Sequence, residues 1–377
     1  MPYSDAVVVI PASYLSFING FSTDMQYARV FIDDISYQLA PRIISSEEIE
    51  RRIEPVYKAL HIPKGQLKAF TGIEQRRWWN EGFRYSDGAI SAAKKCLNKT
   101  NFDIKDIGAI IYTGVCREGY EPATACRVAA QLGANSHTVI HDISNACLGA
   151  MNGIIDIANR IELGQIKAGL VVSCESAHSI VESSIKYLLD NPTMSVFADT
   201  LATLTGGSGA TAILITDGSF TEHQGYHELK GHKLLTVTSR TSAADFEICH
   251  WGMQPVASGL FKEVMTTDAP LLLKKGMNLG NLTWQDFLVE SDWQRSDVNK
   301  LICHQIGSVN RKHVLEQLKF NEKQDFITFP TLGNMGTVSL PVTAAMATEK
   351  SFLKKNDKVA FLGIGSGLSC IMMGLEW

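Results

Sequence analysis

The sequence predicts an α/β protein with mainly parallel sheets and two similar halves, and three observations carry this prediction. Short apolar runs with little alternation recur along the chain, as in parallel strands that are covered on both faces. Amphipathic helical patterns lie between these runs. The order strand, helix, strand, helix, strand occurs twice, first between 107 and 173 and again between 300 and 364.

The predicted strands are short and contain few charged residues, which is typical of strands inside a covered sheet. A further strand is expected at 325–329, because the second copy of the repeated order requires one there. The seven apolar runs that we interpret as strands are 107–113, 138–143, 168–173, 210–216, 234–238, 300–303 and 359–362.

Five helical patterns accompany these strands. Pro122 stands in the first turn of one of them, and Gly164 follows the last apolar position of another, as is typical of helix starts and ends. Pro55 should kink the earliest. The predicted helices are 45–60, 122–132, 147–163, 308–319 and 340–354.

The composition fits a globular chain of one or two domains. Hydrophobic residues make up 45% and charged residues 20% of the 377 residues, which provides ample material for a core. The formal net charge is −4 without a long like-charge run, which argues against a nucleic-acid partner. No apolar run approaches the length of about 18 residues that suggests a membrane span.

The start of the chain and its cysteines indicate a cytoplasmic protein. Residues 1–29 lack a basic start, so we interpret them as an N-terminal extension rather than a signal peptide. The eight cysteines form no C-x-x-C pair and no zinc-like spacing with histidine, so we expect reduced thiols and no metal site.

The repeated order divides the remaining chain into an N-terminal half at 30–226 and a C-terminal half at 227–377. Two stretches, 177–205 and 240–280, fit neither copy of the pattern. We interpret them as insertions that shape a substrate channel.

Cys147 is the first candidate for chemistry. It lies in Asn145-Ala-Cys-Leu-Gly-Ala150, between a predicted strand and a long predicted helix. The positive end of a helix dipole favours a thiolate, which is the nucleophilic form of cysteine. The alternative is a core cysteine in the first helical turn.

Two further candidates come from the C-terminal half. His304 follows a predicted strand, at the kind of strand end where ligands bind in open α/β sheets. Asn334 lies in a glycine-flanked turn ahead of a helix, the place that Cys147 occupies in the first half. Taken singly, His304 is more often a hydrogen-bonded structural histidine and Asn334 a turn former.

The motifs around these residues resemble the thiolase superfamily. They are, in order, Thr71-Gly-Ile-Glu-Gln-Arg-Arg77, Asn145-Ala-Cys-Leu-Gly-Ala150, His304-Gln-Ile-Gly307, Gly333-Asn-Met-Gly-Thr-Val-Ser-Leu-Pro341 and Gly363-Ile-Gly-Ser-Gly-Leu368. The resemblance is to the β-ketoacyl-acyl-carrier-protein synthase III branch. Within that branch, Glu121-Pro122 is similar to the acyl-CoA condensing enzymes of bacterial long-chain olefin biosynthesis.

The resemblance implies a five-layered α-β-α-β-α fold and an acyltransferase. It also implies a homodimer that joins through the third strand of each half. The substrates would be acyl-CoA or acyl carrier protein, with no permanently bound cofactor. Four arginines and lysines would form a basic rim for the carrier or its phosphopantetheine: Arg76, Arg77, Arg311 and Lys312.

The same resemblance implies roles for the candidate residues. Cys147 would take the first acyl group as a thioester, and His304 with Asn334 would stabilise the enolate of the second substrate. The N–H of Cys147 and the backbone at Ser366 would hold the oxyanion. Glu121 would be the base, reaching into the partner subunit's site; the alternative is a surface glutamate near a helix start.

Two condensation chemistries remain open at this stage. Two plain acyl thioesters need a base for the α-carbon, which Glu121 would supply, and this non-decarboxylative Claisen condensation to a β-keto acyl product is our preferred hypothesis. A malonyl thioester on a carrier protein loses CO₂ instead and needs no strong base, as in fatty acid biosynthesis. Further alternatives are a thioesterase and a non-catalytic partner subunit.

Overall fold

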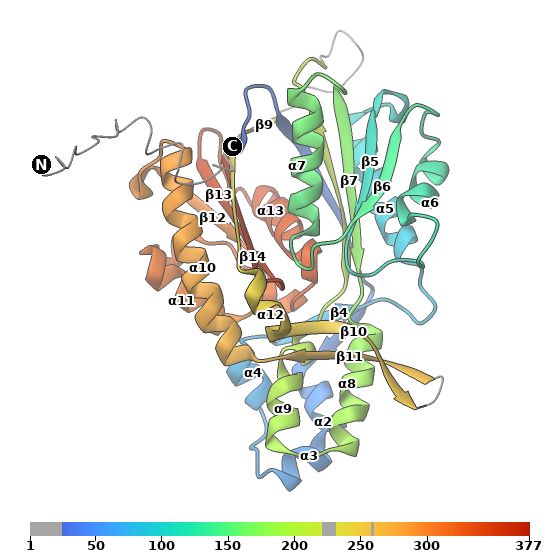
Figure 1. The fold of residues 1–377 in the computed structure, drawn as a ribbon, viewed down its shortest axis with the longest axis vertical. Coiled ribbons are helices and arrows are strands. Elements are labelled where there is room, and N and C mark those ends of the chain that lie inside the picture. Colours follow the sequence, from blue (N-terminus) through green and yellow to red (C-terminus); the bar gives the residue numbers. More distant parts are fainter. Residues whose placement is uncertain (1–24, 221–230, 258–259) are drawn as a thin grey trace, which may run out of the picture.

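The protein is arranged in five layers, seen side by side in Figure 1. The computed structural model describes residues 25–220, 231–257 and 260–377. From one side to the other, helices α10 and α11, a half-sheet, helices α7 and α13, a second half-sheet, and helices α5 and α6 follow one another. The expected layer order is therefore confirmed. The proposed boundary at 226/227 and residues 1–24 lie outside the described residues.

The half-sheet of the N-terminal half has five strands. The parallel pairs are β5–β6 and β5–β7, whereas β8 runs antiparallel to both of its neighbours. In spatial order the strands are β6 (Val139–Ile143), β5 (Ala109–Thr113), β7 (Ala168–Glu175), β8 (Gly209–Thr216) and β2 (Phe31–Leu39).

The half-sheet of the C-terminal half repeats this order with one strand fewer. Only β12 and β13 run parallel, so the whole sheet is mixed and the expectation of mainly parallel sheets is wrong. Antiparallel pairing of β2 with β9 joins the two half-sheets. The strands are, in order, β12 (Lys300–Cys303), β13 (Lys358–Gly365), β14 (Ser369–Glu376) and β9 (His232–Thr241).

The strand expected at 325–329 does not form. Asp325 makes a single parallel bridge with Leu301, in the place that β6 occupies beside β5. Three and four residues further on, the backbone N–H groups of Thr328 and Phe329 donate to the Gln305 side chain at 2.9 and 3.2 Å instead of to a neighbouring strand. Helix α12 (Phe329–Leu332) then begins.

The helices fall close to their expected positions. Helix α6 begins two residues after Pro122, and the break at Pro55 separates α2 from α3 as predicted. Helix α13 ends five residues early. The layer helices are α5 (Tyr85–Thr100), α6 (Thr124–Leu132), α7 (Gly149–Glu162), α10 (Ala269–Glu290), α11 (Ser308–Leu318) and α13 (Ser339–Glu349).

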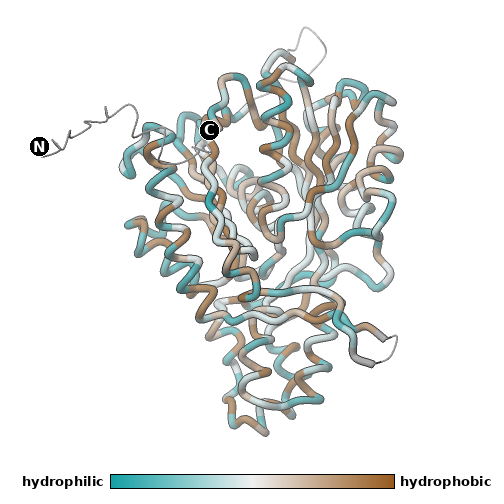
Figure 2. The backbone as a smooth tube through the Cα atoms, in the orientation of Figure 1, coloured by the Kyte–Doolittle hydropathy of each residue, from teal (hydrophilic) through white to brown (hydrophobic). Residues whose placement is uncertain are grey.

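The apolar side chains gather between the layers. Figure 2 shows hydrophobic residues along the strands, with hydrophilic ones on the outer helices. The central cluster contains residues of both halves, including Ile213 of β8 and Phe361 of β13, both fully buried. Burial on both faces explains why these strands read as unbroken apolar runs.

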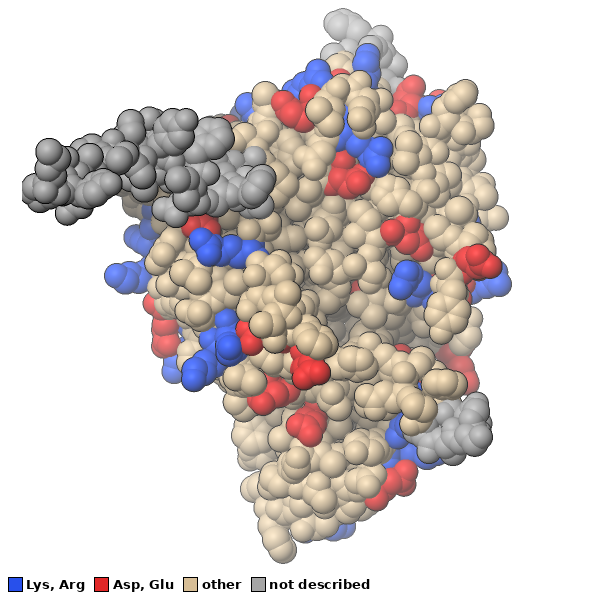
Figure 3. All heavy atoms as spheres, viewed as in Figure 1, with Lys and Arg blue, Asp and Glu red and all other residues tan. Residues whose placement is uncertain are grey.

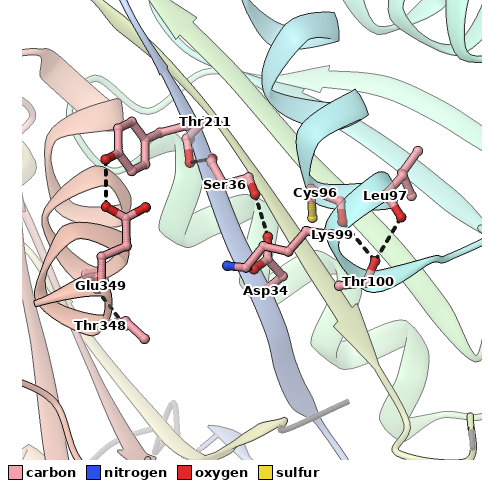
Figure 4. Close-up of polar contacts among 11 residues, drawn as sticks. Asp34, Ser36, Cys96, Leu97, Lys99, Thr100, Thr211, Thr348 and Glu349 are labelled. Carbon is pink, nitrogen blue, oxygen red and sulfur yellow. Dashed lines mark hydrogen bonds and ion pairs between the residues drawn. The ribbon is translucent and has the colours of Figure 1, made fainter. Parts of the chain in front are cut away.

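Polar contacts tie β2 to the layers on either side of it (Figure 4). Asp34 is buried, accepts a hydrogen bond from the Ser36 hydroxyl at 2.6 Å and pairs with Lys99 of α5. On the other side, the Tyr37 hydroxyl donates to Glu349 of α13 at 2.8 Å. A buried carboxylate needs such partners to offset its desolvation.

The two insertions meet in a lobe below the sheets, drawn at the bottom of Figure 1. Helix α8 (His178–Asp190) and helix α9 (Met194–Leu201) pack against the hairpin of β10 (Cys249–Ala257) and β11 (Leu260–Thr267). The second insertion ends before α10, because α10 is not part of the lobe and packs on β9 and β14 of the sheet. The rest of the lobe is α2 (Ser46–Arg52), α3 (Glu54–Ala59), α4 (Gln66–Thr71), β3 (Arg42–Ser45) and β4 (Gln75–Trp78).

In chain order the strands of the N-terminal half-sheet are β2, β5, β6, β7 and β8, so its third strand is β6, which pairs with β5 alone. The expectation of a dimer that joins through this strand stays a prediction. The edge of this half-sheet is β6, where Val139 is 37% exposed.

The surface and the helices bear on possible partners. On the face drawn in Figure 3, basic and acidic side chains are interspersed and do not form one basic patch. No helix in the described ranges is long and apolar enough to cross a membrane.

Candidate active site

Cys147 lies in a tight turn between β6 and α7. Ala146 has a φ of 44°, in the left-handed region, and the N–H of Leu148 donates to the carbonyl of Asn145 at 2.8 Å. A non-glycine residue in this region costs about 1–2 kcal/mol, and such strain concentrates at functional sites. Helix α7 begins at Gly149, so Cys147 precedes the helix and is not in its first turn.

The electrostatics of this turn favour a neutral thiol, which corrects the expectation of a thiolate. Burial raises the pKa of Cys147 to about 12, with further contributions from Cys249 and Glu175. Desolvation outweighs the helix dipole here. Cys147 is therefore a neutral thiol at pH 7, and acyl transfer must move its proton.

The end of β13 lies directly against the Cys147 turn. A Cβ on Gly365 would stand 3.4 Å from the backbone nitrogen of Cys147, and one on Gly363 would come within 2.6 Å of the Leu148 side chain. Glycine is required for this approach. The turn after β13, which contains Ser366, is thereby placed beside Cys147.

His304 follows β12, the strand next to β13. Its backbone N–H donates to the carbonyl of Leu362 at 2.9 Å. The side chain is 9% exposed, and its Nδ1 atom has no hydrogen-bond partner. Burial lowers the pKa of His304 to about 4, so its imidazole is neutral at pH 7 and can donate one hydrogen bond.

Asn334 is held by the N-terminal half. Its N–H donates to Thr205 at 3.0 Å, and its carbonyl accepts the N–H of Gly207 at 2.8 Å. The side-chain oxygen accepts the N–H of Gly336 at 3.0 Å, so the amide presents its N–H₂ end to other groups.

The segment after Asn334 contacts the Cys147 helix. The hydroxyl of Thr337 accepts the N–H of Ala150 at 2.6 Å. The Cys147 turn thus contacts both the Asn334 segment and the end of β13, next to which His304 emerges. These contacts bring together the elements that carry Cys147, His304, Asn334 and Ser366.

Glu121 is not part of this assembly within one chain. It is exposed, in an exposed stretch at 117–122, and no described contact joins it to Cys147, His304 or Asn334. It also precedes the first residue of α6 by three positions. The N–H groups at the start of α6, those of Thr124 and Ala125, donate to Asp142 instead.

The proposed basic rim is wrong for Arg76. This side chain is fully buried, donates to Ser46 and to the carbonyl of Leu204, and burial lowers its pKa to about 10. Arg311 pairs with the buried Asp325 at 2.8 Å, so its charge is largely balanced. Arg77 donates to the carbonyl of Ala40 at 3.2 Å. Lys312 remains well exposed.

Sequence reasoning missed Glu175, the last residue of β7. It is 4% exposed and accepts the N–H groups of Val115 and Cys116. The sequence contained a sign of its role. A single carboxylate at the end of an otherwise apolar strand costs free energy to bury, which suggests a specific function.

Comparisons with known proteins identify the family. Residues 71–216 match the family Thiolase, N-terminal domain, and residues 288–377 match 3-Oxoacyl-[acyl-carrier-protein (ACP)] synthase III C terminal. An acyl-CoA:acyl-CoA alkyltransferase of Shewanella oneidensis is 53% identical, over 94% of this chain and 100% of the relative. The chain belongs to the acyl-CoA:acyl-CoA alkyltransferase family. It is therefore an acyltransferase with the thiolase fold, as its motifs predict.

Solved structures agree with this family. OleA of Xanthomonas campestris with bound cerulenin has a TM-score of 0.86 and 30% identity, over 94% of this chain and 98% of that chain. An OleA variant with serine in place of a cysteine contains bound lauric acid and lauroyl-CoA, with a TM-score of 0.85. A β-ketoacyl-ACP synthase III of Clostridium tetani is more distant, at 28% identity.

Gly207→Ala tests how tightly the Asn334 loop is positioned. A Cβ at this position would meet the carbonyl oxygen of Leu332 at 2.0 Å, so the loop must shift. We expect acyltransferase activity to fall by about 10²-fold, because a displacement of about 1 Å is enough for such a loss. Gly280→Ala is the control: its Cβ meets nothing within 4 Å, so activity should persist and the helix should gain about 0.5–1 kcal/mol. Full activity in Gly207→Ala would contradict this account of the loop.

Proposed function

We propose that this chain joins two acyl-CoA thioesters by a non-decarboxylative Claisen condensation and releases a β-keto acyl product. The observation that carries the proposal is the convergence of the Cys147 turn, the strand end with His304 and the loop with Asn334. The names of the 53% identical relative and of the lauroyl-CoA complex support acyl-CoA as the substrate class.

In the first half-reaction, the Cys147 sulfur attacks the thioester carbonyl of one acyl-CoA. The acyl–cysteine bond forms, the bond to CoA breaks, and the cysteine proton leaves with the CoA thiol. We assign stabilisation of the intermediate oxyanion to the backbone N–H of Cys147 and to that of the turn at Ser366, an assignment supported by the close approach of Gly365 to the Cys147 nitrogen. Since a thiol with a pKa of about 12 does not ionise unaided, the proton of Cys147 moves to the CoA sulfur as the new bond forms and the old one breaks.

In the second half-reaction, a second acyl-CoA loses an α-proton. His304 and Asn334 donate hydrogen bonds to its thioester oxygen, where the enolate charge develops. Glu121 takes the proton. The enolate carbon attacks the acyl–cysteine, the new carbon–carbon bond forms, the bond from the acyl group to Cys147 breaks, and the released sulfur takes the proton that Glu121 had accepted.

The position of Glu121 requires a second copy of the chain in this scheme. The exposed stretch at 117–122 follows β5, and the neighbouring strand β6 has one unpaired edge with Val139 exposed. Unpaired strand edges are templates for pairing with another chain. We propose a homodimer through β6, in which Glu121 completes the partner's site.

The compartment follows from the thiols. All eight cysteines lie within the described residues and are free. Free thiols in this number support the cytoplasm as the location of the reaction.

The decarboxylative alternative is supported by the match of residues 288–377 to the synthase III family. In that reaction the loss of CO₂ generates the enolate, and an acyl carrier protein delivers the malonyl group. His304 and Asn334 would keep their roles, whereas Glu121 would be dispensable.

The product assay separates the two chemistries. With lauroyl-CoA alone, the parent protein should form the β-keto product, and Glu121→Ala should lose about 10²-fold or more of this activity because no other base is supplied. Intact-protein mass spectrometry measures acylation of Cys147. The acyl adduct should still form in Glu121→Ala and should be absent in Cys147→Ala. Product only with a malonyl thioester, together with an active Glu121→Ala variant, would establish the alternative.

His304→Ala and Asn334→Ala should spare acylation more than condensation. Each removes one donor to the enolate, which is worth about 3 kcal/mol, or about 10²-fold in the condensation step. Single-turnover acylation and steady-state condensation measure the two steps separately. An equal loss of both steps in His304→Ala would show that the imidazole is also essential for proton relay from Cys147.

Mixing two inactive variants tests whether Glu121 acts across the dimer. If it does, Glu121→Ala and Cys147→Ala refolded together should recover about a quarter of the parent activity, since half of the dimers are mixed and one of their two sites is intact. If Glu121 acts within its own chain, each site of the mixed dimer lacks one group and no activity returns.

A further inference from the structure

We propose that Glu175 is a positioning residue whose carboxylate holds the segment leading to Glu121 and the segment following Asn334 in place around Cys147. This inference rests on the proposed function for its condensation readout only. It assigns work to a buried carboxylate that the reaction scheme does not otherwise use.

The first attachment is to the turn after β5. The Oε1 atom of Glu175 accepts the N–H of Val115 at 3.0 Å, and the Oε2 atom accepts the N–H of Cys116 at 3.1 Å. Both carboxylate oxygens are thus used at the base of the stretch that carries Glu121. Charge-assisted bonds of this type are about twice as strong as neutral ones.

The second attachment is to the segment that follows Asn334. The backbone N–H of Thr337 lowers the pKa of Glu175, and a Cβ on the preceding Gly336 would stand 3.4 Å from the carboxylate, while the Thr337 hydroxyl accepts the N–H of Ala150 at 2.6 Å. One carboxylate therefore joins segments of both halves, and Thr337 connects them to the helix that follows Cys147.

Two glycines leave room for this carboxylate. A Cβ on Gly114 would stand 3.2 Å from Oε1 of Glu175, and one on Gly336 would stand 3.4 Å from it. Both glycines have positive φ values, 150° and 55°. The backbone of each segment is thus shaped closely around the carboxyl group.

Among the described residues no salt bridge joins Glu175 to a lysine or arginine; its charge is balanced by backbone N–H groups and the Cys116 thiol. Burial raises the pKa of Glu175 to about 7, against the opposing effect of these donors. The charge in turn raises the pKa of Cys147. Burial keeps the other titratable groups around Glu175 neutral at pH 7: Tyr85, Tyr112, Cys116, Cys147 and Cys174.

Glu50 provides a matched structural control. It is 7% exposed and accepts the N–H groups of Gly65 and Leu67, each at 2.7 Å. As at Glu175, each carboxylate oxygen accepts a backbone N–H, but both donors lie at the start of α4, in the lobe with α2 and α4. Replacing Glu50 therefore measures the effect of losing a buried carboxylate and its hydrogen bonds at a place that does not contact the Cys147 turn.

The test compares Glu175→Gln with Glu50→Gln. The glutamine amide can accept hydrogen bonds at its oxygen only, so its N–H₂ end must face a backbone donor and one segment is released. We expect Glu175→Gln to retain acylation of Cys147 by lauroyl-CoA and to lose about 10-fold or more of the condensation step. Glu50→Gln should leave the ratio of condensation to acylation unchanged, even if its melting temperature falls by as much as that of Glu175→Gln.

A second readout needs no acyl substrate. The rate of Cys147 alkylation by iodoacetamide, followed at the Cys147 peptide by mass spectrometry, should match the parent at pH 6, where Glu175 is protonated. At pH 8 the Glu175→Gln variant should react several-fold faster, because the parent carries a negative charge that opposes the thiolate. Glu175→Asp, which keeps the charge, should restore the parent pH profile.

The outcomes are distinct. An unchanged pH profile and an unchanged ratio of condensation to acylation in Glu175→Gln would overturn the proposal. So would the same change of ratio in Glu50→Gln. Because alkylation does not depend on the acyl substrate, its result stands even if the condensation proves to be decarboxylative, so failure of the proposed function would be seen separately.

Discussion

The site depends on the close approach of β13 to the Cys147 turn. Gly363 and Gly365 leave no side chain between this strand and Cys147–Leu148, so backbone from the C-terminal half reaches backbone of the N-terminal half. Once that contact is made, β12 places His304 through its parallel pairing with β13. A Cβ at Gly365 would stand 3.2 Å from the Leu148 side chain and 3.4 Å from the Cys147 nitrogen, so the turn would have to shift by a few tenths of an ångström.

Burial also determines the protonation states within the site. Burial raises the pKa of Cys147 to about 12 and that of Glu175 to about 7, and lowers that of His304 to about 4. All three shifts favour the neutral form, as desolvation demands. Such a site suits thioester chemistry, since charge develops only on the substrate and meets hydrogen-bond donors that are already in place. The strained backbone at Ala146 is part of the same arrangement, because it projects Cys147 ahead of α7.

The two halves are similar in order but unequal in completeness. Beside β5 a full strand forms, whereas beside β12 only Asp325 makes a bridge, and the N–H groups of Thr328 and Phe329 donate to Gln305. The unequal halves leave β6 as the edge of the N-terminal half-sheet, near the exposed stretch that carries Glu121. The halves also differ in their chemistry: the first carries the nucleophile Cys147, and the second carries the hydrogen-bond donors His304 and Asn334.

The sequence by itself determined the α/β class, most strand and helix positions, and the motifs that lead to the family. These are local properties, since periodicity, caps and short motifs are set by neighbouring residues. It could not determine the mixed direction of the sheet or the loss of the strand at 325–329, which depend on distant partners such as Gln305. Sequence patterns also led to wrong expectations for the exposure of Arg76 and for the ionisation of Cys147, and they did not reveal the contacts of Glu175. Burial and donors from remote segments decide these properties, and only the tertiary structure brings those segments together.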